Sequence, residues 1–244
     1  MRWFYLIFGL IAYLFFNTIF IYMAGFLTNF MVPKSMDVPL SNLTLAQAFW
    51  TDVTLMLLFA LHHSVAPRPF FKRWLARLLP SHLERSVYVL MAALLLGMVL
   101  WHWQPLPMPI WRVEQGGVVY LIHGVFIVGI ITSLVAMFQT DHYELFGLRQ
   151  ILLYWKNQPY FPPPFNEKGL YKWVRHPMML GTLLVLWATP HMTAGHLLFS
   201  VFLSCYIFIG IFFEERDLEA TLGALYVDYR QRVPMVIPFI KRSH

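Results

Sequence analysis

Residues 118–138 read VVYLIHGVFIVGIITSLVAMF, an apolar stretch without a single Asp, Glu, Lys or Arg. A helix needs ~20 apolar residues to cross the hydrocarbon core of a bilayer, so this stretch predicts a membrane span. Because backbone polar groups inside the bilayer must be satisfied within the segment, the span is expected to be helical. This one stretch therefore indicates the fold class.

Similar apolar stretches recur along the chain. Of its 244 residues, 59% are hydrophobic and only 12% are charged, whereas a soluble domain has about 25% charged residues. We predict an all-α, polytopic membrane bundle with five spans, or six if a short arm at 178–189 also crosses. The apolar stretches lie at 3–30, 48–66, 87–104, 118–138, 178–189 and 196–213.

Lysine and arginine are distributed unevenly between the predicted loops. Five lie in loop 67–85, five in loop 139–177 and five in the tail 214–244, whereas the other loops hold only Lys34 and Arg112. Basic loops stay in the cytoplasm. We therefore expect an integral protein of the inner or plasma membrane with both termini in the cytoplasm. The net charge of +6 then reflects topology and anionic lipid headgroups, and it needs no nucleic-acid partner.

No internal repeat or flexible linker divides the chain, so we expect a single membrane domain over residues 1–244. Within it, residues 1–138 are expected to form a region of four membrane helices. Residues 139–244 are expected to hold a ligand-binding hairpin and a cytoplasmic C-terminal helix over 214–230. Leucines at helical spacing also predict one short interfacial helix between 144 and 155.

Ionisable side chains flank the last hairpin at both ends. Arg175 and His176 precede Pro177, which suits the first turn of a helix beginning near 178, and Glu214 and Glu215 follow the second apolar arm. A helix N-terminus favours anions, and charge beside a membrane segment is costly unless it meets a partner. The set predicts a ligand with both signs of charge, such as S-adenosylmethionine. The alternative is that Arg175 marks the cytoplasmic side and the glutamates balance nearby arginines.

The stretch 169–238 resembles the isoprenylcysteine carboxyl methyltransferase and phospholipid methyltransferase superfamily. Its pattern is G-x-Y-x-x-x-R-H-P-x-Y-x-G, a hydrophobic hairpin, E-E-x-x-L, then G-x-x-Y-x-x-Y and V-P. One position departs, because Met179 stands where the pattern has its second tyrosine. The matching residues are Gly169 (offset by one), Tyr171, Arg175, His176, Pro177, Gly181, Glu214, Glu215, Leu218, Gly223, Tyr226, Tyr229 and Pro234.

Stretches further upstream resemble the methanethiol S-methyltransferase branch, with which NnrU-like membrane proteins share parts of the architecture. They are LHHS at 61–64, ERSVYVL at 84–90, WHWQP at 101–105 and ELFGLRQ at 144–150. The resemblance implies transfer of a methyl group from S-adenosylmethionine to methanethiol, a small thiol, giving dimethyl sulfide. The predicted cofactor-binding residues are Phe165, Gly169, Tyr171, Arg175, His176, Pro177, Met179, Glu214 and Glu215.

Adjacent residues on a helix point in different directions, so only one of the two glutamates is expected to face the cofactor. We favour Glu214, which lies one residue nearer the apolar boundary. Oligomeric state is not indicated by the sequence.

A thiol reacts as its thiolate, so a proton acceptor is expected beside it. The predicted catalytic residues are His63 and His142, at the cytoplasmic ends of the second and fourth spans, with Arg85 and Tyr88 orienting the base. Glu84 is expected to hold Arg85. The alternative is that these histidines make ordinary interfacial hydrogen bonds. A soft metal would also generate a thiolate, but no tight metal-ligand spacing is present, and we predict no metal site.

Two other functions are open from the sequence. One is methylation of a different acceptor, isoprenylcysteine or a phospholipid amine, which would need a long groove and a polar clamp. The residues before Glu214, Ile209 to Phe213, are instead mostly apolar. The other is a protein that is not a methyltransferase, either a haem or quinone protein using intramembrane histidines or an NnrU-like accessory protein.

Overall fold

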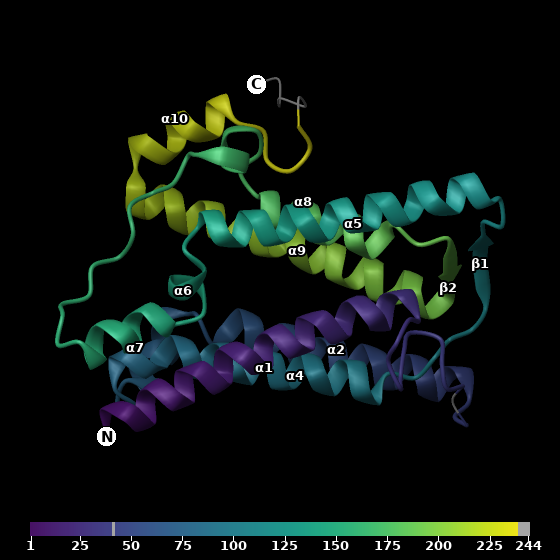
Figure 1. Ribbon diagram of the computed structural model, residues 1–244, viewed down its shortest axis with the longest axis horizontal. Coiled ribbons are helices and arrows are strands. Elements are labelled where there is room, and N and C mark those ends of the chain that lie inside the picture. The colour runs from purple at the N-terminus through teal and green to yellow at the C-terminus, as the bar shows by residue number, and fades with distance from the viewer. Residues whose placement is uncertain (41, 239–244) are drawn as a thin grey trace. The chain divides into compact units, whose positions relative to one another are not determined.

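The computed structural model describes residues 1–40 and 42–238, and this part of the chain is mostly helical (Figure 1). Among these residues, five helices are long and apolar enough to cross a membrane, which confirms the predicted polytopic all-α bundle. The end of the predicted basic tail, 239–244, lies outside the described residues. The five are α1 (Arg2–Thr28), α2 (Leu45–Val65), α4 (Glu84–His102) with the preceding short helix η1 (Ser81–Leu83), α5 (Gly116–Gln139) and α9 (Ala194–Leu222).

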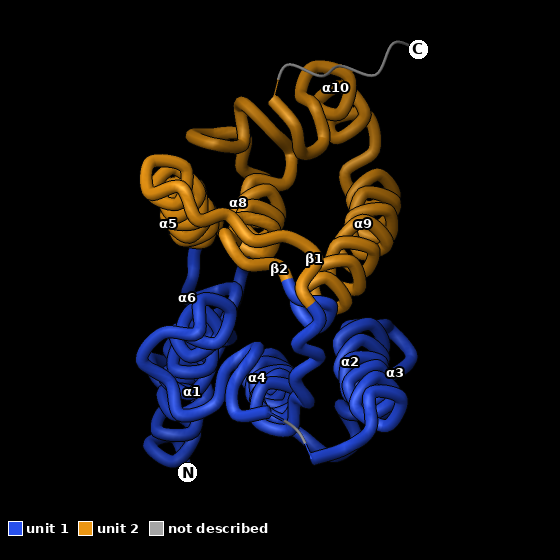
Figure 2. Tube along the Cα trace, turned by 90° about the vertical axis from the view of Figure 1, so that its right-hand side faces the viewer, with its two compact units in different colours: residues 1–108, 141–163, 193–196 blue, residues 109–140, 164–192, 197–244 orange. Residues whose placement is uncertain are grey.

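The chain forms two compact units that alternate along the sequence (Figure 2). The first unit comprises residues 1–108, 141–163 and 193–196, and the second comprises 109–140, 164–192 and 197–244. The sequence-based division of the membrane domain into a four-helix region, 1–138, and a cofactor-binding region, 139–244, stays a prediction.

In the first unit, α1 packs against α4 and α7 (Leu148–Trp155), and α2 packs against α4. The start of α2 has a capping box, in which the Thr44 hydroxyl accepts from the Gln47 N–H and the Gln47 side chain accepts from the Thr44 N–H. This arrangement satisfies N–H groups that lack a helical partner. The unit also contains α3 (Pro69–Leu75) and α6 (His142–Leu145).

The predicted interfacial helix over 144–155 is two helices, α6 and α7, in the structure. Gly147 separates them with a φ of 80°, a conformation that favours glycine. A Cβ at this position would lie 2.7 Å from the backbone nitrogen of Ser86. The close approach of α4 therefore requires the glycine that interrupts the helix.

In the second unit, α5 packs against α8 (Pro177–Trp187). Ser133 donates to the Met178 carbonyl (3.2 Å), and Gly129 lies opposite Gly181, so the two helices run antiparallel. A Cβ on Gly129 would come within 2.8 Å of the Gly181 carbonyl oxygen. Small residues at such a contact allow membrane helices to approach closely.

The predicted arm 178–189 is helical only in part. Helix α8 has 11 residues and rises about 16 Å, roughly half the ~30 Å hydrocarbon core. The chain then continues to β2 (His191–Thr193), which pairs with β1 (Pro109–Arg112). Since β1 lies just before the first residue of α5, the arm returns along α5 to the beginning of that helix.

The predicted cytoplasmic helix over 214–230 is also divided differently. Helix α9 continues past the two glutamates to Leu222, because no helix-breaking residue occurs before Gly223. Gly223 has φ 58° and ψ −130°, backbone angles that only glycine adopts readily. Helix α10 (Ala224–Arg232) follows.

Candidate functional site

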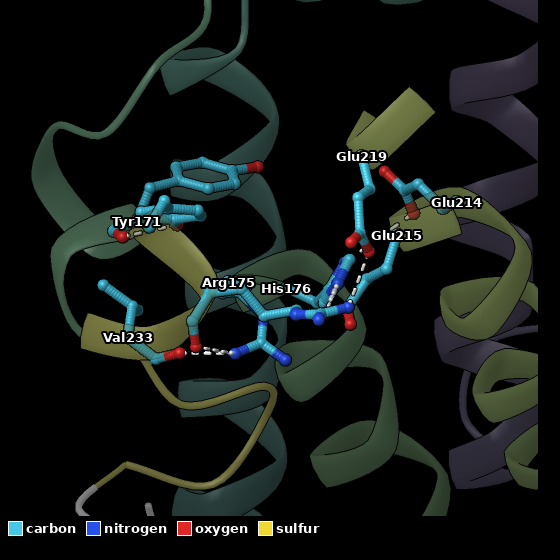
Figure 3. A network of polar contacts seen from close by, with 9 residues as sticks. Tyr171, Arg175, His176, Glu214, Glu215, Glu219 and Val233 are labelled. Carbon is cyan, nitrogen blue, oxygen red and sulfur yellow. Dashed lines mark hydrogen bonds and ion pairs between the residues drawn. The ribbon is translucent and has the colours of Figure 1, made fainter. Parts of the chain in front are cut away.

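Glu215 is the centre of the charged cluster in the second unit (Figure 3). Its Oε1 accepts a hydrogen bond from Arg175 Nε (2.7 Å) and lies 3.0 Å from His176 Nε2. All three side chains are buried, with Arg175 8% and Glu215 10% exposed. Charge-assisted hydrogen bonds of this kind are about twice as strong as neutral ones. We call Arg175, His176, Glu214 and Glu215 the clasp.

Glu214 has different surroundings from its neighbour. Its side chain is 52% exposed, and its Oε2 lies 3.7 Å from His176 Nδ1. The 100° turn between adjacent helical residues explains the difference. The protein itself therefore engages Glu215, whereas Glu214 presents its carboxylate outward.

The helix N-terminus that the sequence predicts as an anion site already has an anion beside it. Pro177 occupies the first turn of α8, as predicted, and His176 is the N-cap residue. The carboxylate bonded to that histidine is Glu215. Met179 lies half-buried in the first turn of the same helix, where its thioether offers no hydroxyl to a ligand.

Arg175 also binds the C-terminal part of the chain. Its Nη1 donates to the carbonyl oxygens of Arg230 (3.0 Å) and Val233 (2.5 Å). The backbone N–H groups of residues 175–176 donate to the carbonyls of residues 234–235, at 2.9 and 3.0 Å. The two ends of the sequence pattern are thus joined directly, which explains why arginine and Val-Pro occur together in it.

A buried aromatic cluster lies behind the clasp. Tyr226, Tyr229 and Val233 form its centre, and the Tyr229 hydroxyl donates to the Tyr171 carbonyl (2.7 Å). Phe165, a predicted cofactor residue, packs edge-on against Tyr229 at 5.2 Å between ring centres. Its described contacts are therefore with this cluster.

Tyr226 in the same cluster has an unusual hydroxyl. The residue is 1% exposed, and its hydroxyl oxygen has no hydrogen-bond partner among the described residues. Burial, and next the negative charge of Glu215, raise the pKa of Tyr226. The hydroxyl therefore stays protonated and is able to donate a hydrogen bond.

The segment that leads to the clasp is held by Gln139 at the end of α5. The Gln139 side chain accepts from the Leu170 N–H (2.9 Å), and its carbonyl accepts from the Asn166 side chain (2.6 Å). Gly169, with a φ of 61°, begins the short helix η2 (Gly169–Lys172), which contains Leu170. The segment is thereby placed beside α5 before it enters α8.

Tyr171 lies in η2 and is labelled with the clasp in Figure 3. Burial raises the pKa of Tyr171 to about 12, a hydrogen bond with Thr140 lowers it, and the charge of Glu214 raises it further. Tyr171 is therefore a neutral phenol within electrostatic range of Glu214.

The predicted catalytic residues His63, Arg85 and Tyr88 lie together in the first unit. The Tyr88 hydroxyl lies 3.0 Å from His63 Nδ1, and the Arg85 guanidinium lies over the Tyr88 ring, 5.4 Å from its centre. The expected pair of Glu84 with Arg85 is wrong. Glu84 pairs instead with Lys72 (3.1 Å), because Arg85 turns towards α6.

His142, the other predicted proton acceptor, begins α6 in the same unit. Its ring contacts the Tyr143 ring, with 4.0 Å between centres. Arg85 Nε donates to the Leu145 carbonyl of α6 (2.9 Å). The structure therefore links α6 to the helix that carries Arg85 and Tyr88.

Sequence reasoning missed His62. A cavity of about 200 Å³ is lined by His62, together with Arg85 and Tyr88, and not by His63. The adjacent histidines were visible in the sequence, but the direction each side chain takes depends on how α2 packs. Within residues 1–40 and 42–238, no group of three or more His, Cys, Asp or Glu side chains could hold a metal ion.

These observations define a multi-pass, all-α membrane protein with a buried charged cluster beside its last hairpin. Residues 53–224 match the family model described as NnrU protein, and the chain belongs to this family.

Named relatives cover nearly the whole chain. Methanethiol S-methyltransferase 2 of Bradyrhizobium diazoefficiens is 45% identical over 233 residues, covering 96% of this chain and 89% of that protein. Methanethiol S-methyltransferase of Mycobacterium tuberculosis is 42% identical over 241 residues, covering 99% and 98%. Nurim of Bos taurus is 28% identical over 179 residues, covering 69% and 67%. No solved structure matches the chain significantly.

Proposed function

We propose that the protein methylates methanethiol, with S-adenosylmethionine as the methyl donor, and produces dimethyl sulfide at the cytoplasmic side of the membrane. The observation that carries this proposal is 42–45% identity, over almost the full chain, to proteins named methanethiol S-methyltransferase. The chemistry of the clasp, and of His63 with Arg85 and Tyr88, is compatible with it.

The residues around the clasp suit S-adenosylmethionine, which carries a carboxylate, an ammonium and a sulfonium. Glu214 offers a half-exposed carboxylate, 3.7 Å from His176 Nδ1. Tyr226 offers a buried hydroxyl without a partner among the described residues, and leaving such a group unsatisfied costs about 1–3 kcal/mol. A polar ligand or a water molecule beside the clasp would remove that cost.

When bound, S-adenosylmethionine supplies an electrophilic methyl group on its sulfonium sulfur. Glu214 is the proposed contact for its ammonium or ribose hydroxyls, and His176 and Tyr171 are further proposed contacts. Arg175 and Glu215 position these groups through their mutual ion pair and through the bonds of Arg175 to the C-terminal segment. Holding the reactants in one geometry is the main catalytic contribution expected of these residues.

Methylation of a thiol also requires removal of the thiol proton. A histidine ring nitrogen is the proposed acceptor, and His63 and His142 are the candidates from the sequence. The hydroxyl of Tyr88 holds the His63 ring. The guanidinium of Arg85 favours the thiolate over the thiol, because a nearby positive charge stabilises an anion.

The test is a headspace assay. Membranes that contain the protein receive methanethiol and S-adenosylmethionine, and gas chromatography follows dimethyl sulfide, which is expected to accumulate. If the donor binds and no dimethyl sulfide forms at any thiol concentration, the proposal is wrong. With radiolabelled donor, label in the lipid fraction would instead identify a lipid or prenyl acceptor.

The His176→Ala substitution tests the donor site separately. It is expected to weaken binding of S-adenosylmethionine in calorimetry, because it removes a clasp contact. The matched control is His191→Ala, which changes an exposed histidine of the same unit and is expected to leave the affinity unchanged.

A further inference from the structure

The cavity in the first unit has features that the proposed function does not yet use. It lies among α2, α3 and α4, and apolar side chains, among them Ala66, Phe71 and Val87, form most of its wall. A mostly apolar wall favours a ligand that itself partitions into lipid.

The size of the cavity limits the ligand. Its volume of about 200 Å³ is smaller than the roughly 300–1,000 Å³ of pockets for drug-sized molecules. It is much larger than the roughly 10–15 Å³ that a single water requires. The cavity therefore fits a molecule of several heavy atoms, more than the one carbon and one sulfur of methanethiol.

His62 gives the cavity a proton acceptor. Its Nδ1 is buried and has no hydrogen-bond partner among the described residues. Its ring is nearly parallel to the Tyr88 ring, with an interplanar angle of 15° and 6.0 Å between centres. The next residue, His63, has its ring nitrogen at the Tyr88 hydroxyl instead. Of the two histidines, His62 is the one that lines the cavity.

The charges around the cavity favour an anion. Lys72 and Glu84 line it as an ion pair, with 3.1 Å between Nζ and Oε1, so their charges offset each other. Arg85 then contributes one positive charge, since its bond to the Leu145 carbonyl is to a neutral group. A positive charge beside a thiol stabilises its thiolate.

We propose that this cavity binds short alkanethiols, from methanethiol to propanethiol, and that His62 accepts the thiol proton. The proposal rests on the proposed function and names its substrate class. The S–H bond breaks, the proton goes to a ring nitrogen of His62, and the electron pair remains on sulfur.

The first experiment measures binding without the methyl donor. Thermal unfolding of the purified protein is followed with and without propanethiol, which is expected to raise the melting temperature because it binds the folded state. Ala66→Leu, which fills the cavity, is expected to abolish this rise. Ala76→Leu, at an exposed alanine of the neighbouring α3 end, is the control and should retain it. If propanethiol still raised the melting temperature of Ala66→Leu, the cavity would not be the thiol site.

The second experiment measures methylation of methanethiol, ethanethiol and propanethiol in the headspace. All three thioethers are expected, and Ala66→Leu should lower kcat/KM for propanethiol about tenfold more than for methanethiol. Val87→Leu is the second filling variant in case Ala66→Leu does not fold. Methylation of methanethiol alone, or an equal loss for all three thiols, would contradict the proposal. If no dimethyl sulfide formed while propanethiol still stabilised the protein, the proposed function would be wrong and the thiol cavity would stand.

The third experiment assigns the proton acceptor. His62→Ala is expected to lower kcat about 10²-fold or more for every thiol, with a smaller change in KM. His63→Ala should change kcat less, since its ring is held by Tyr88 outside the cavity wall. A larger loss of kcat in His63→Ala than in His62→Ala would overturn the role of His62.

Discussion

Glu214 and Glu215 have the same chemistry, and burial alone gives them different roles. Glu215 accepts from Arg175 inside the protein, whereas the Glu214 side chain is half exposed. Breaking a buried ion pair leaves an uncompensated charge, which is costly. Breaking an exposed contact changes little.

Removing Glu215 should therefore damage the fold more than removing Glu214. Glu215→Ala is expected to lower the free energy of unfolding by about 3–5 kcal/mol, and Glu214→Ala by less than about 1 kcal/mol. Denaturant titration in mixed micelles measures both. Glu214→Ala should still weaken binding of S-adenosylmethionine. Equal destabilisation by the two substitutions would show that the buried pair is not what distinguishes them.

Alkaline pH should destabilise the second unit through Tyr171. Its folded pKa of about 12 lies above the ordinary 10.0, so the folded state favours the protonated phenol. The resulting stability is present in full below pH 10 and is lost as the pH rises through 12. The melting temperature should fall across this range, and less steeply in Tyr171→Phe. Tyr120→Phe, at a tyrosine that is 80% exposed, is the control. An unchanged slope in Tyr171→Phe would contradict the assignment.

At the residue scale, the sequence predicts which residue types cluster but not how they pair. Arg175, His176 and the two glutamates were identified from their position beside a membrane hairpin. The choice of Glu215 for the internal ion pair, and of His62 for the cavity, depends on the rotation of a helix about its axis. One residue is a 100° turn, and only tertiary packing sets that rotation.

At the scale of elements, the contact of α5 with α8 depends on two glycines, which have no side chain. Gly129 and Gly181 bring the two backbones together, and a Cβ on either would lie closer than 3.0 Å to a backbone atom of the other helix. Backbone atoms cannot move aside as the end of a flexible side chain does. Gly181, which belongs to the sequence pattern, therefore allows α5 and α8 to pack closely.

Gly181→Ala should consequently destabilise the protein, by about 1–3 kcal/mol as for other overpacked sites. Gly124→Ala in α5 is the matched control, because a Cβ there meets nothing within 4 Å. That control is expected to be neutral or slightly stabilising, since alanine favours helix by roughly 0.5–1 kcal/mol. Thermal unfolding in detergent compares the two. Similar melting temperatures would mean that the helices can separate without cost.

The sequence predicts helices well and their interruptions poorly. All five long spans follow from apolar length, which the bilayer requires directly. Gly147 and Gly223 end helices in the structure, yet a lone glycine is also tolerated within helices. At Gly147 the helix ends where α4 approaches the backbone, and a single sequence does not contain that information.

At the scale of the whole molecule, the number of crossings determines where the chain ends. Five spans alone would put the termini on opposite sides, whereas the arginine and lysine distribution predicts that both lie in the cytoplasm. Helix α8 rises about 16 Å, and the six residues 188–193 add about 20 Å if extended. Together they match the roughly 36 Å of the 24-residue α5. We therefore propose that the arm supplies the sixth crossing.

A non-helical segment at membrane depth is stable only if its backbone groups are satisfied by protein. Beside β1, the Thr189 carbonyl accepts from the Trp111 indole (3.1 Å), and the Pro190 carbonyl accepts from the Val113 N–H (2.9 Å). The Ala188 N–H donates to the Leu184 carbonyl (2.9 Å). These bonds would allow the arm to leave its helix early and still complete the proposed crossing.

Cysteine labelling tests this topology. In a Cys205→Ser background, Glu114→Cys should react with a membrane-impermeant maleimide in intact cells, because residue 114 precedes α5 on the predicted outer side. Gln158→Cys and Gln231→Cys should react only after permeabilisation. All three positions are exposed. Since Arg175 Nη1 bonds the neighbouring Arg230 carbonyl, Gln231 also reports the side on which the clasp lies. Labelling of Gln231→Cys in intact cells would remove the sixth crossing, and it would place the clasp away from the compartment where S-adenosylmethionine is made.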